Sequence, residues 1–136
     1  MNFDQCFDRL IGHAGGHVND PRDPGGATNL GISRRAYPGE DIAGMTIERA
    51  KLLYRRDYWG PAGCDGAPDA VKLHLFELAV NSGVRAAIKA VQRAVHEVED
   101  GVLGSATLQA MQSMPPLRLV ARITGAGLQA FRQIEI

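Results

Sequence analysis

One stretch near the N-terminus, residues 15–31, constrains the fold more than any other part of the sequence. It holds five glycines and two prolines in 17 positions. No long helix tolerates that composition, whereas short strands and tight turns do. We therefore expect a first helix to stop at Gly15–Gly16 and a small β-hairpin to follow within residues 16–33. The side chains expected to face inward from this hairpin are Val18, Ala27 and Ile32.

The rest of the chain has the apolar periodicity of helices. Further helices are expected after Thr46, after Asp69, across residues 84–95, after Ser105 and from Pro116, with Thr46, Asp69 and Ser105 as N-caps. In the helix after Thr46, one face is expected to carry Ile47, Ala50 and Tyr54. The helix after Asp69 is apolar on all sides, which is typical of a helix buried at the centre of a domain. The predicted fold class is mainly α (α+β), with about six helices around this buried central helix and a small β-hairpin after the first helix.

Size and charge narrow the class of protein. The chain has 136 residues, enough for one domain with its own core. Its 15 basic and 15 acidic residues balance, which argues against non-specific nucleic-acid binding. No stretch approaches 18 apolar residues, so no membrane insertion is expected. Cys6 and Cys64 form no C-x-x-C pair and are expected to be reduced thiols in a monomeric protein.

Polar side chains crowd into the same glycine-rich stretch. Asp20, Asp23, Thr28 and Asn29 lie within ten residues, just after a predicted helix end. Such residues build turns without any further function, and composition alone favours that interpretation. The alternative is an active-site loop.

The order of these residues resembles the opening motif of the glycoside hydrolase 108 family, the phage-type N-acetylmuramidases. In that family the motif reads roughly E-G-G-[aromatic]-x-N-D-P-x-D-P-G-G-A-T-N-x-G-I-[ST]. The resemblance continues in the right order through most of the chain. The matching residues are Gly15-Gly16, Asn19-Asp20-Pro21, Asp23 to Asn29, Gly31-Ile32-Ser33, Tyr54 to Trp59, Phe76 to Gly83, Gln92-Arg93 and Asp100 to Gly104.

The resemblance implies a single lysozyme-like domain over residues 1–136, with a catalytic half at 1–83 and a predicted peptidoglycan-domain half at 84–136. It implies an endolysin-type hydrolase that cleaves the β-1,4 bond between N-acetylmuramic acid and N-acetylglucosamine in peptidoglycan glycan strands, without cofactor or metal. The N-terminus lacks the pattern of a secretory signal. We therefore expect synthesis in the cytoplasm and action on the cell wall, in the periplasm, after release by a holin or a secretion system.

The catalytic position departs from the family motif. The family's glutamate would fall at position 14, where this chain has Ala14, and the aromatic residue three positions later is His17. Phage-type lysozymes combine a helix-terminal glutamate, an aspartate nine positions on and a nearby threonine, and Asp23 and Thr28 keep that spacing. A glycosidase needs a carboxylic acid to protonate the departing oxygen and a second polar group to hold water. Asp23 and Thr28 fit the water side, whereas Ala14 has no proton to donate.

Two explanations of Ala14 stay open. The glutamate was replaced deliberately, to spare an expression host or to trap substrate, or the chain is a natural pseudoenzyme that keeps its glycan groove and binds peptidoglycan without turnover. The survival of the motif around the gap favours the first explanation.

A zinc peptidase is a remote alternative. With glutamate at position 14, residues 13–17 would read H-E-x-x-H, the signature that places two histidines on one helix face around a zinc ion. The two intervening glycines cost such a helix roughly 2 kcal/mol. The sequence offers no convincing third ligand, because His74 and Glu77 lie on the helix predicted to be core.

Several side chains are candidates for contact with sugar. The flat rings of Tyr58 and Trp59 suit sugar faces, and burial of the tryptophan in the core is an equal alternative. Asn81 either contacts sugar or caps its helix, and Glu77 either is a hydrogen-bonded core group or faces a cleft. An acidic residue also occupies the position of Glu77 in the family. The full set of predicted substrate-binding residues is His17, Asn29, Tyr58, Trp59, Glu77 and Asn81.

Overall fold

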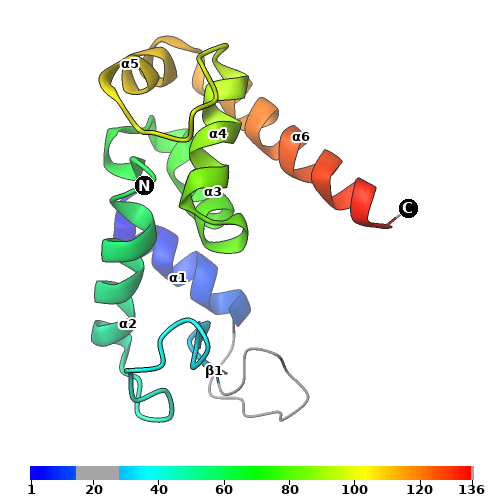
Figure 1. The fold of residues 1–136 in the computed structure, drawn as a ribbon. Coiled ribbons are helices and arrows are strands. Elements are labelled where there is room, and N and C mark those ends of the chain that lie inside the picture. Colours follow the sequence, from blue (N-terminus) through cyan, green and yellow to red (C-terminus); the bar gives the residue numbers. More distant parts are fainter. Residues whose placement is uncertain (15–27, 136) are drawn as a thin grey trace. The chain divides into compact units, whose positions relative to one another are not determined.

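The structure of the protein is a computed structural model that describes residues 1–14 and 28–135, with the backbone alone at 12–14, 28 and 126–135. Six α-helices and one two-stranded hairpin form the regular part of the described chain (Figure 1). The prediction of a mainly helical fold, with a small β-hairpin after the first helix, is confirmed. The chain forms two compact units: residues 4–54, here called the N-terminal unit, and residues 1–3 with 55–136, here called the helical unit.

The N-terminal unit is built on two helices and the hairpin. Its elements are α1 (Phe3–Ala14, whose first residue belongs to the helical unit), β1 (Thr28–Asn29), β2 (Ile32–Ser33) and α2 (Ile47–Tyr54). α1 ends at Ala14, directly before the glycine pair, as the composition predicts. The buried ring of Phe7 on α1 meets the ring of Tyr54 on α2 edge-on, with centroids 5.6 Å apart. Lys51 of α2 adds an ion pair with Asp4 of α1, at 3.1 Å. The apolar face of α1 therefore packs on α2.

The hairpin turns through two residues that both have positive φ angles. β1 and β2 pair antiparallel, and between them Leu30 has φ 52° and Gly31 has φ 78°. Two-residue hairpin loops of this kind match the twist of the strands, but they strain any residue other than glycine. The Tyr54 hydroxyl donates a hydrogen bond of 2.9 Å to the Leu30 carbonyl and so holds the strained turn. Ile32 is buried, as predicted, whereas Val18 and Ala27 lie outside the described residues.

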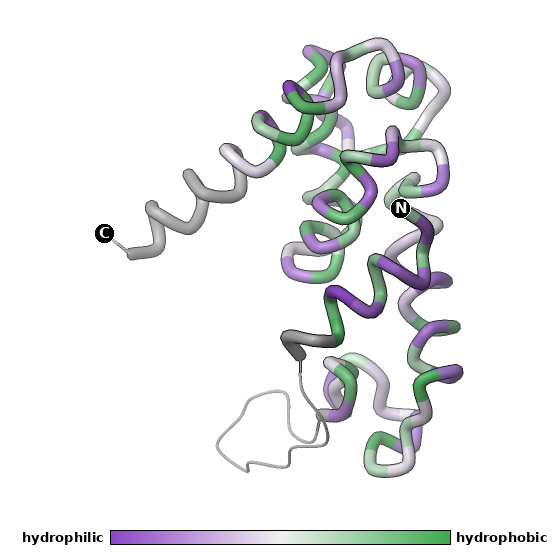
Figure 2. The backbone as a smooth tube through the Cα atoms, turned by 180° about the vertical axis from the view of Figure 1, so that it is seen from behind, coloured by the Kyte–Doolittle hydropathy of each residue, from purple (hydrophilic) through white to green (hydrophobic). Residues whose placement is uncertain are grey.

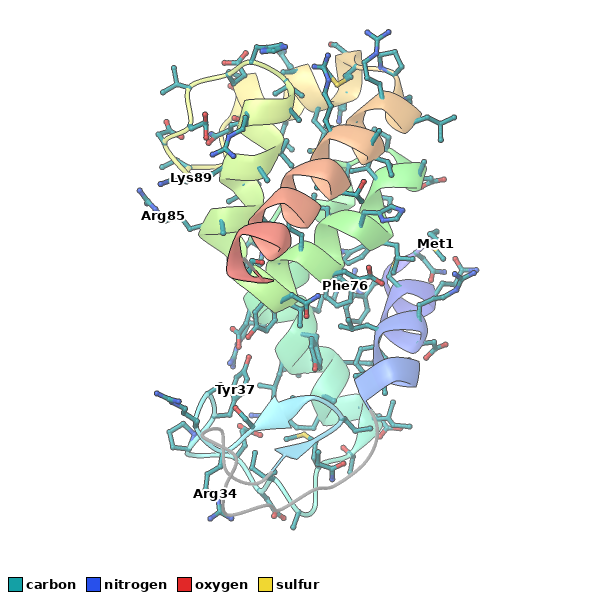
Figure 3. The ribbon with its side chains drawn as sticks, turned by 90° about the vertical axis from the view of Figure 1, so that its right-hand side faces the viewer. Met1, Arg34, Tyr37, Phe76, Arg85 and Lys89 are labelled. Carbon is teal, nitrogen blue, oxygen red and sulfur yellow. The ribbon has the colours of Figure 1, made fainter. Side chains whose placement is uncertain are left out.

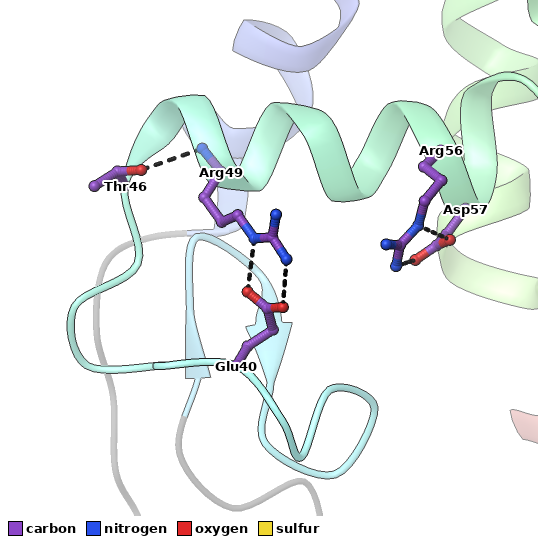
Figure 4. Close-up of polar contacts among 5 residues, drawn as sticks. All are labelled: Glu40, Thr46, Arg49, Arg56 and Asp57. Carbon is purple, nitrogen blue, oxygen red and sulfur yellow. Dashed lines mark hydrogen bonds and ion pairs between the residues drawn. The ribbon is translucent and has the colours of Figure 1, made fainter.

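α2 begins with the predicted cap. The Thr46 hydroxyl accepts a hydrogen bond from the Arg49 backbone N–H at 3.1 Å, which satisfies one of the free donors of the first turn (Figure 4). The Arg49 guanidinium then donates two hydrogen bonds, of 2.9 and 2.7 Å, to the Glu40 carboxylate. These two hydrogen bonds connect the segment after the hairpin to α2.

The face of α2 that carries Ile47, Ala50 and Tyr54 is only partly buried. Ala50 and Tyr54 are buried, but Ile47 is 54% exposed, and Leu53 is buried in its place. Ile47 is the first residue of the helix, where no preceding turn covers the side chain.

The helical unit has α3 at its centre. It contains a π-helix η1 (Arg55–Trp59), a short 3-10 helix η2 (Cys64–Gly66), α3 (Asp69–Ser82), α4 (Val84–Ala94), α5 (Ser105–Ser113) and α6 (Pro116–Glu135). α3 packs against α4, α6, η1 and η2, which confirms the predicted central helix. Its buried residues are Val71, Leu75, Phe76 and Ala79.

The remaining helices show a clear division between buried and exposed faces, and hydrophobic and hydrophilic residues alternate along them in Figure 2. On α4, Ala87, Ile88 and Val91 are buried, while Arg85 and Lys89 project outward in Figure 3. No helix in the described part of the chain is long and apolar enough to cross a membrane.

Two predicted N-caps are wrong by one residue. Asp69 and Ser105 are the first residues of α3 and α5, and the cap positions are Pro68 and Gly104, neither of which makes a side-chain cap bond. The Pro68 carbonyl accepts the backbone N–H groups of residues 71 and 72, as an N-cap carbonyl does, so Asp69 is already inside the helix. The Asp69 carboxylate instead lies 3.6 Å from the terminal ammonium of Met1. α6 does open at Pro116, as predicted, and the buried Cys6 and Cys64 are not joined in a disulfide.

Candidate active site

The candidate catalytic positions belong to the N-terminal unit. Ala14 is the last residue of α1, and Thr28 is the first residue of β1. Figures 1 and 3 both show the C-terminal end of α1 next to the hairpin. Thr28 pairs with Ser33 of β2 in the register of the hairpin. Asp23 and His17 lie outside the described residues, so their predicted roles remain predictions.

Asn29 anchors the hairpin. Its side-chain amide nitrogen donates to the carbonyls of Ile42 and Ala43, at 3.1 and 3.4 Å. Together with the Tyr54 hydroxyl on the Leu30 carbonyl, these bonds attach the strand that begins with Thr28 to the rest of the unit. The structure therefore gives Asn29 a structural role. This role was not predicted from the sequence, which indicated a sugar contact. An Asn beside a hairpin turn was the only signal in the sequence.

Trp59 is a core residue of the helical unit. It is 1% exposed, and its ring lies edge-on to Phe3 and Phe76, with both centroid distances 5.3 Å. Its indole N–H donates a hydrogen bond of 2.8 Å to the Asp65 carboxylate, which satisfies its only polar group. Of the two interpretations the sequence allowed, the structure matches the core residue, and Trp59 is not available to stack on sugar. The neighbouring Tyr58 is half-buried.

α3 carries the remaining candidates. Glu77 is half-buried and Asn81 is exposed, and their spacing of four residues places them on one face of the helix. The Asn81 side chain makes no hydrogen bond to any described residue, and the helix ends instead at Gly83, which has φ 96°. This argues against the capping role for Asn81. A group of three metal-ligating side chains is absent from the described residues.

A second polar cluster lies at residues 100–104, where the polar groups bond to one another and to Gln92. The carboxamide of Gln92, 1% exposed, donates to the Asp100 carboxylate at 2.9 Å and accepts the Gly101 backbone N–H at 3.0 Å. The Val102 N–H also reaches the Asp100 carboxylate, at 2.9 Å. These two donors, Val102 first, lower the pKa of Asp100 from its usual 3.8. This cluster is a tight turn.

The mainly helical fold, with an α-helix that ends at the candidate catalytic position beside a small anchored hairpin, is that of the lysozyme-like glycoside hydrolases. The sequence pattern of the family described as glycosyl hydrolase 108 matches residues 7–83, which includes every candidate site residue. The chain belongs to this family of peptidoglycan-degrading muramidases.

A solved structure extends the similarity beyond the matched residues. The structure of Brucella abortus SagA superposes with a TM-score of 0.85 at 31% sequence identity, and the match covers 96% of this chain and 79% of the SagA chain. No curated protein matches the sequence. The lysozyme-like fold predicted from the sequence is thereby confirmed across both units, each of which contributes candidate residues.

Proposed function

We propose that the chain carries the scaffold of an N-acetylmuramidase that hydrolyses the β-1,4 bond between N-acetylmuramic acid and N-acetylglucosamine, and that Ala14 leaves it without its general acid. The observation that supports this most strongly is the position of Ala14. It is the last residue of α1, next to the hairpin that Thr28 opens, inside the segment that matches the family.

The proposed chemistry needs two groups on opposite sides of the scissile bond. An acid at position 14 protonates the departing glycosidic oxygen, and Asp23 with Thr28 holds and activates the attacking water. The methyl group of Ala14 transfers no proton. The loss of a general acid costs about 10² to 10⁴ in rate. We therefore propose that the chain as it stands has no appreciable muramidase activity.

The proposed sugar contacts come from the helical unit. Glu77 and Asn81 share a face of α3, and both retain exposed surface. The Asn81 amide can donate to and accept from sugar hydroxyls, because no described residue engages it. Tyr58 retains part of its ring surface for a sugar face, whereas the buried Trp59 has none.

A peptidoglycan-binding module without turnover is the second candidate function, and Ala14 is the observation that favours it. Both candidates have glycan strands of the cell wall as partner. We propose that the protein acts there as a monomer after a holin or secretion-type release, with no nucleic-acid partner.

Three forms of the protein separate the two candidates: the unmodified chain, Ala14→Glu, and the matched control Ala14→Gln, which has the same size but no acidic proton. Each is assayed for turbidity loss of a peptidoglycan suspension and for pulldown on the same material. We expect all three to bind and only Ala14→Glu to lyse. Lysis by the unmodified chain at the rate of Ala14→Glu contradicts the loss of the acid. Binding by all three without lysis by Ala14→Glu supports the binding module.

A further inference from the structure

We propose that a cavity between α4 and α6 is a binding site for a small carboxylate on a short alkyl chain, distinct from the catalytic positions and independent of whether the chain turns over. The cavity has a volume of about 320 Å³. Its apolar lining is made of small residues from both helices: Ala90, Ala94, Ala121 and Gly125. Arg93, His96 and Arg122 complete the wall. Three nitrogen-rich side chains, all of them exposed, thus line one small open pocket with an apolar floor.

The backbone of His96 has a left-handed conformation that usually favours glycine, which indicates that its side chain has a function. The Glu97 N–H bonds to the Gln92 carbonyl at 2.8 Å, and the His96 N–H bonds to the Arg93 carbonyl at 3.3 Å. These two bonds define a Schellman motif, in which the residue at the position of His96 adopts a left-handed conformation and is usually glycine. His96 has φ 61°, a strained angle for a residue with a side chain. Residues in such conformations cluster at binding and active sites.

Arg122 orients the imidazole and covers the end of α4. Its Nη1 donates a hydrogen bond of 2.7 Å to the Ala94 carbonyl, the last of the helix, and lies 3.3 Å from His96 Nε2. An arginine nitrogen always donates, so Nε2 of His96 is the acceptor in this contact. Because Arg122 covers the negative end of the helix dipole, an anion in the cavity does not face a bare carbonyl.

The carboxylate of Glu99 already binds Arg93, on one side of the cavity. The guanidinium of Arg93 donates two hydrogen bonds, of 3.0 and 2.9 Å, to a single oxygen of Glu99. The Arg93 side chain is 66% exposed, and exposed pairs of this kind exchange readily with other anions. Glu99 is therefore a weak internal competitor, and its removal frees Arg93 for the ligand.

The shape of the cavity selects the ligand class. Guanidinium groups bind planar carboxylates through paired hydrogen bonds, and the alanine and glycine lining favours a ligand that brings a short alkyl group. The volume suits a small molecule or the end of a chain and is too small for a glycan strand. A free short-chain acid and the terminal alanine of a peptide share this chemistry.

The test is an NMR titration of the isotope-labelled full chain. The probes are propionate for the free acid, N-acetyl-D-alanine for the peptide end, propionamide as the uncharged analogue, and inorganic phosphate. We expect both carboxylates to shift the signals of the lining residues, tighter binding of whichever source the site is built for, and no comparable effect of propionamide or phosphate. Equal binding of propionamide or of phosphate overturns the carboxylate assignment.

Four variants make the test specific. His96→Gly relieves the strained φ, so it should melt at or above the temperature of the unmodified protein and yet bind N-acetyl-D-alanine about tenfold more weakly. Arg93→Ala should also weaken binding, whereas Glu99→Gln should strengthen it. Arg118→Ala, an exposed arginine of the same helix that does not line the cavity, is the matched control and should bind unchanged. The proposal fails if His96→Gly binds as tightly as the unmodified chain, or if Arg118→Ala weakens binding as much as Arg93→Ala.

Discussion

Two turns of this protein, the Asp100–Gly104 turn and the hairpin turn at Leu30–Gly31, are held in place in different ways. In the Asp100–Gly104 turn, the buried Gln92 binds the Asp100 carboxylate and also lies 3.1 Å from the Val102 carbonyl and 3.2 Å from the Thr107 hydroxyl. Gly101, with φ 73°, is required there because a Cβ would lie 2.7 Å from the Arg85 side chain. The polar groups of this turn therefore form hydrogen bonds with other groups of the protein.

The hairpin of the N-terminal unit is held differently. Its described contacts are made from outside, by the Asn29 amide on the 42–43 carbonyls and by the Tyr54 hydroxyl on the Leu30 carbonyl. The Asp100–Gly104 turn is therefore organised around a buried side chain, whereas the described part of the hairpin is bonded to neighbouring segments through Asn29 and Leu30. This difference gives the predictions that follow.

The largest expected effect concerns Asp23. In the Ala14→Glu background, Asp23→Asn should lower turnover by about 10² to 10⁴, because the attacking water loses its base, and Thr28→Ala should lower it less. Asp100→Asn in the same background is the matched control from the Asp100–Gly104 turn and should turn over normally. Initial rates of turbidity loss provide the measurement. If Asp23→Asn and Thr28→Ala both leave turnover untouched, the segment is only a turn.

The next effect concerns the stability of the Asp100–Gly104 turn. Gln92→Leu should lower the free energy of unfolding by about 2 to 3 kcal/mol, because its partners, Asp100 and Gly101, lose a buried carboxamide. The exposed Gln109 on α5 offers a control, and Gln109→Leu should change stability by less than about 0.5 kcal/mol. Urea denaturation measures both. Equal stability of the two variants would show that the turn does not depend on Gln92.

A smaller effect is expected at the hairpin. Asn29→Ala should cost about 1 kcal/mol, the usual contribution of a hydrogen bond from a partly exposed amide. Asn81→Ala, which removes an exposed amide with no hydrogen-bond partner among the described residues, should cost almost nothing. A loss at Asn81 as large as the loss at Asn29 would contradict the structural role given to Asn29.

The smallest expected effect is on pH dependence. The Val102 N–H and the Gln92 amide lower the pKa of Asp100 below 3.8, so folding favours its charged form. This contribution to stability is present above the usual pKa and is lost as pH falls through the lowered value. The Tm of the unmodified protein, relative to Asp100→Asn, should therefore be constant near neutral pH and decline only in acid. A difference that grows as the pH falls has the wrong sign for this account.

Much of the fold could be predicted because local rules determine it. The stop of α1 at the glycine pair, the cap at Thr46 and the opening of α6 at Pro116 each follow from one or two neighbouring residues. The caps at Asp69 and Ser105 were wrong because a cap residue and a first-turn residue are chemically similar and differ only in backbone angles. The start of each of these two helices therefore depends on the backbone angles of a single residue.

Contacts between distant residues could not be predicted from the sequence. The Tyr54 hydroxyl meets Leu30 24 positions away, and Arg122 meets Ala94 28 positions away. Neither pair is marked by a local sequence motif, because the tertiary packing of distant segments brings the partners together. For the same reason, the burial of Trp59 by Phe3 and Phe76 remained one of two alternatives until the structure resolved it.

We proposed that this muramidase scaffold lacks its general acid at position 14, and the chemistry of the new chain ends tests this proposal most directly. Purified peptidoglycan is treated with the unmodified chain or with Ala14→Glu, reduced with borohydride, hydrolysed and analysed for reduced amino sugars. The account predicts reduced muramic acid after treatment with Ala14→Glu and none above background with the unmodified chain. Reduced glucosamine in its place, or equal release by both proteins, would contradict it.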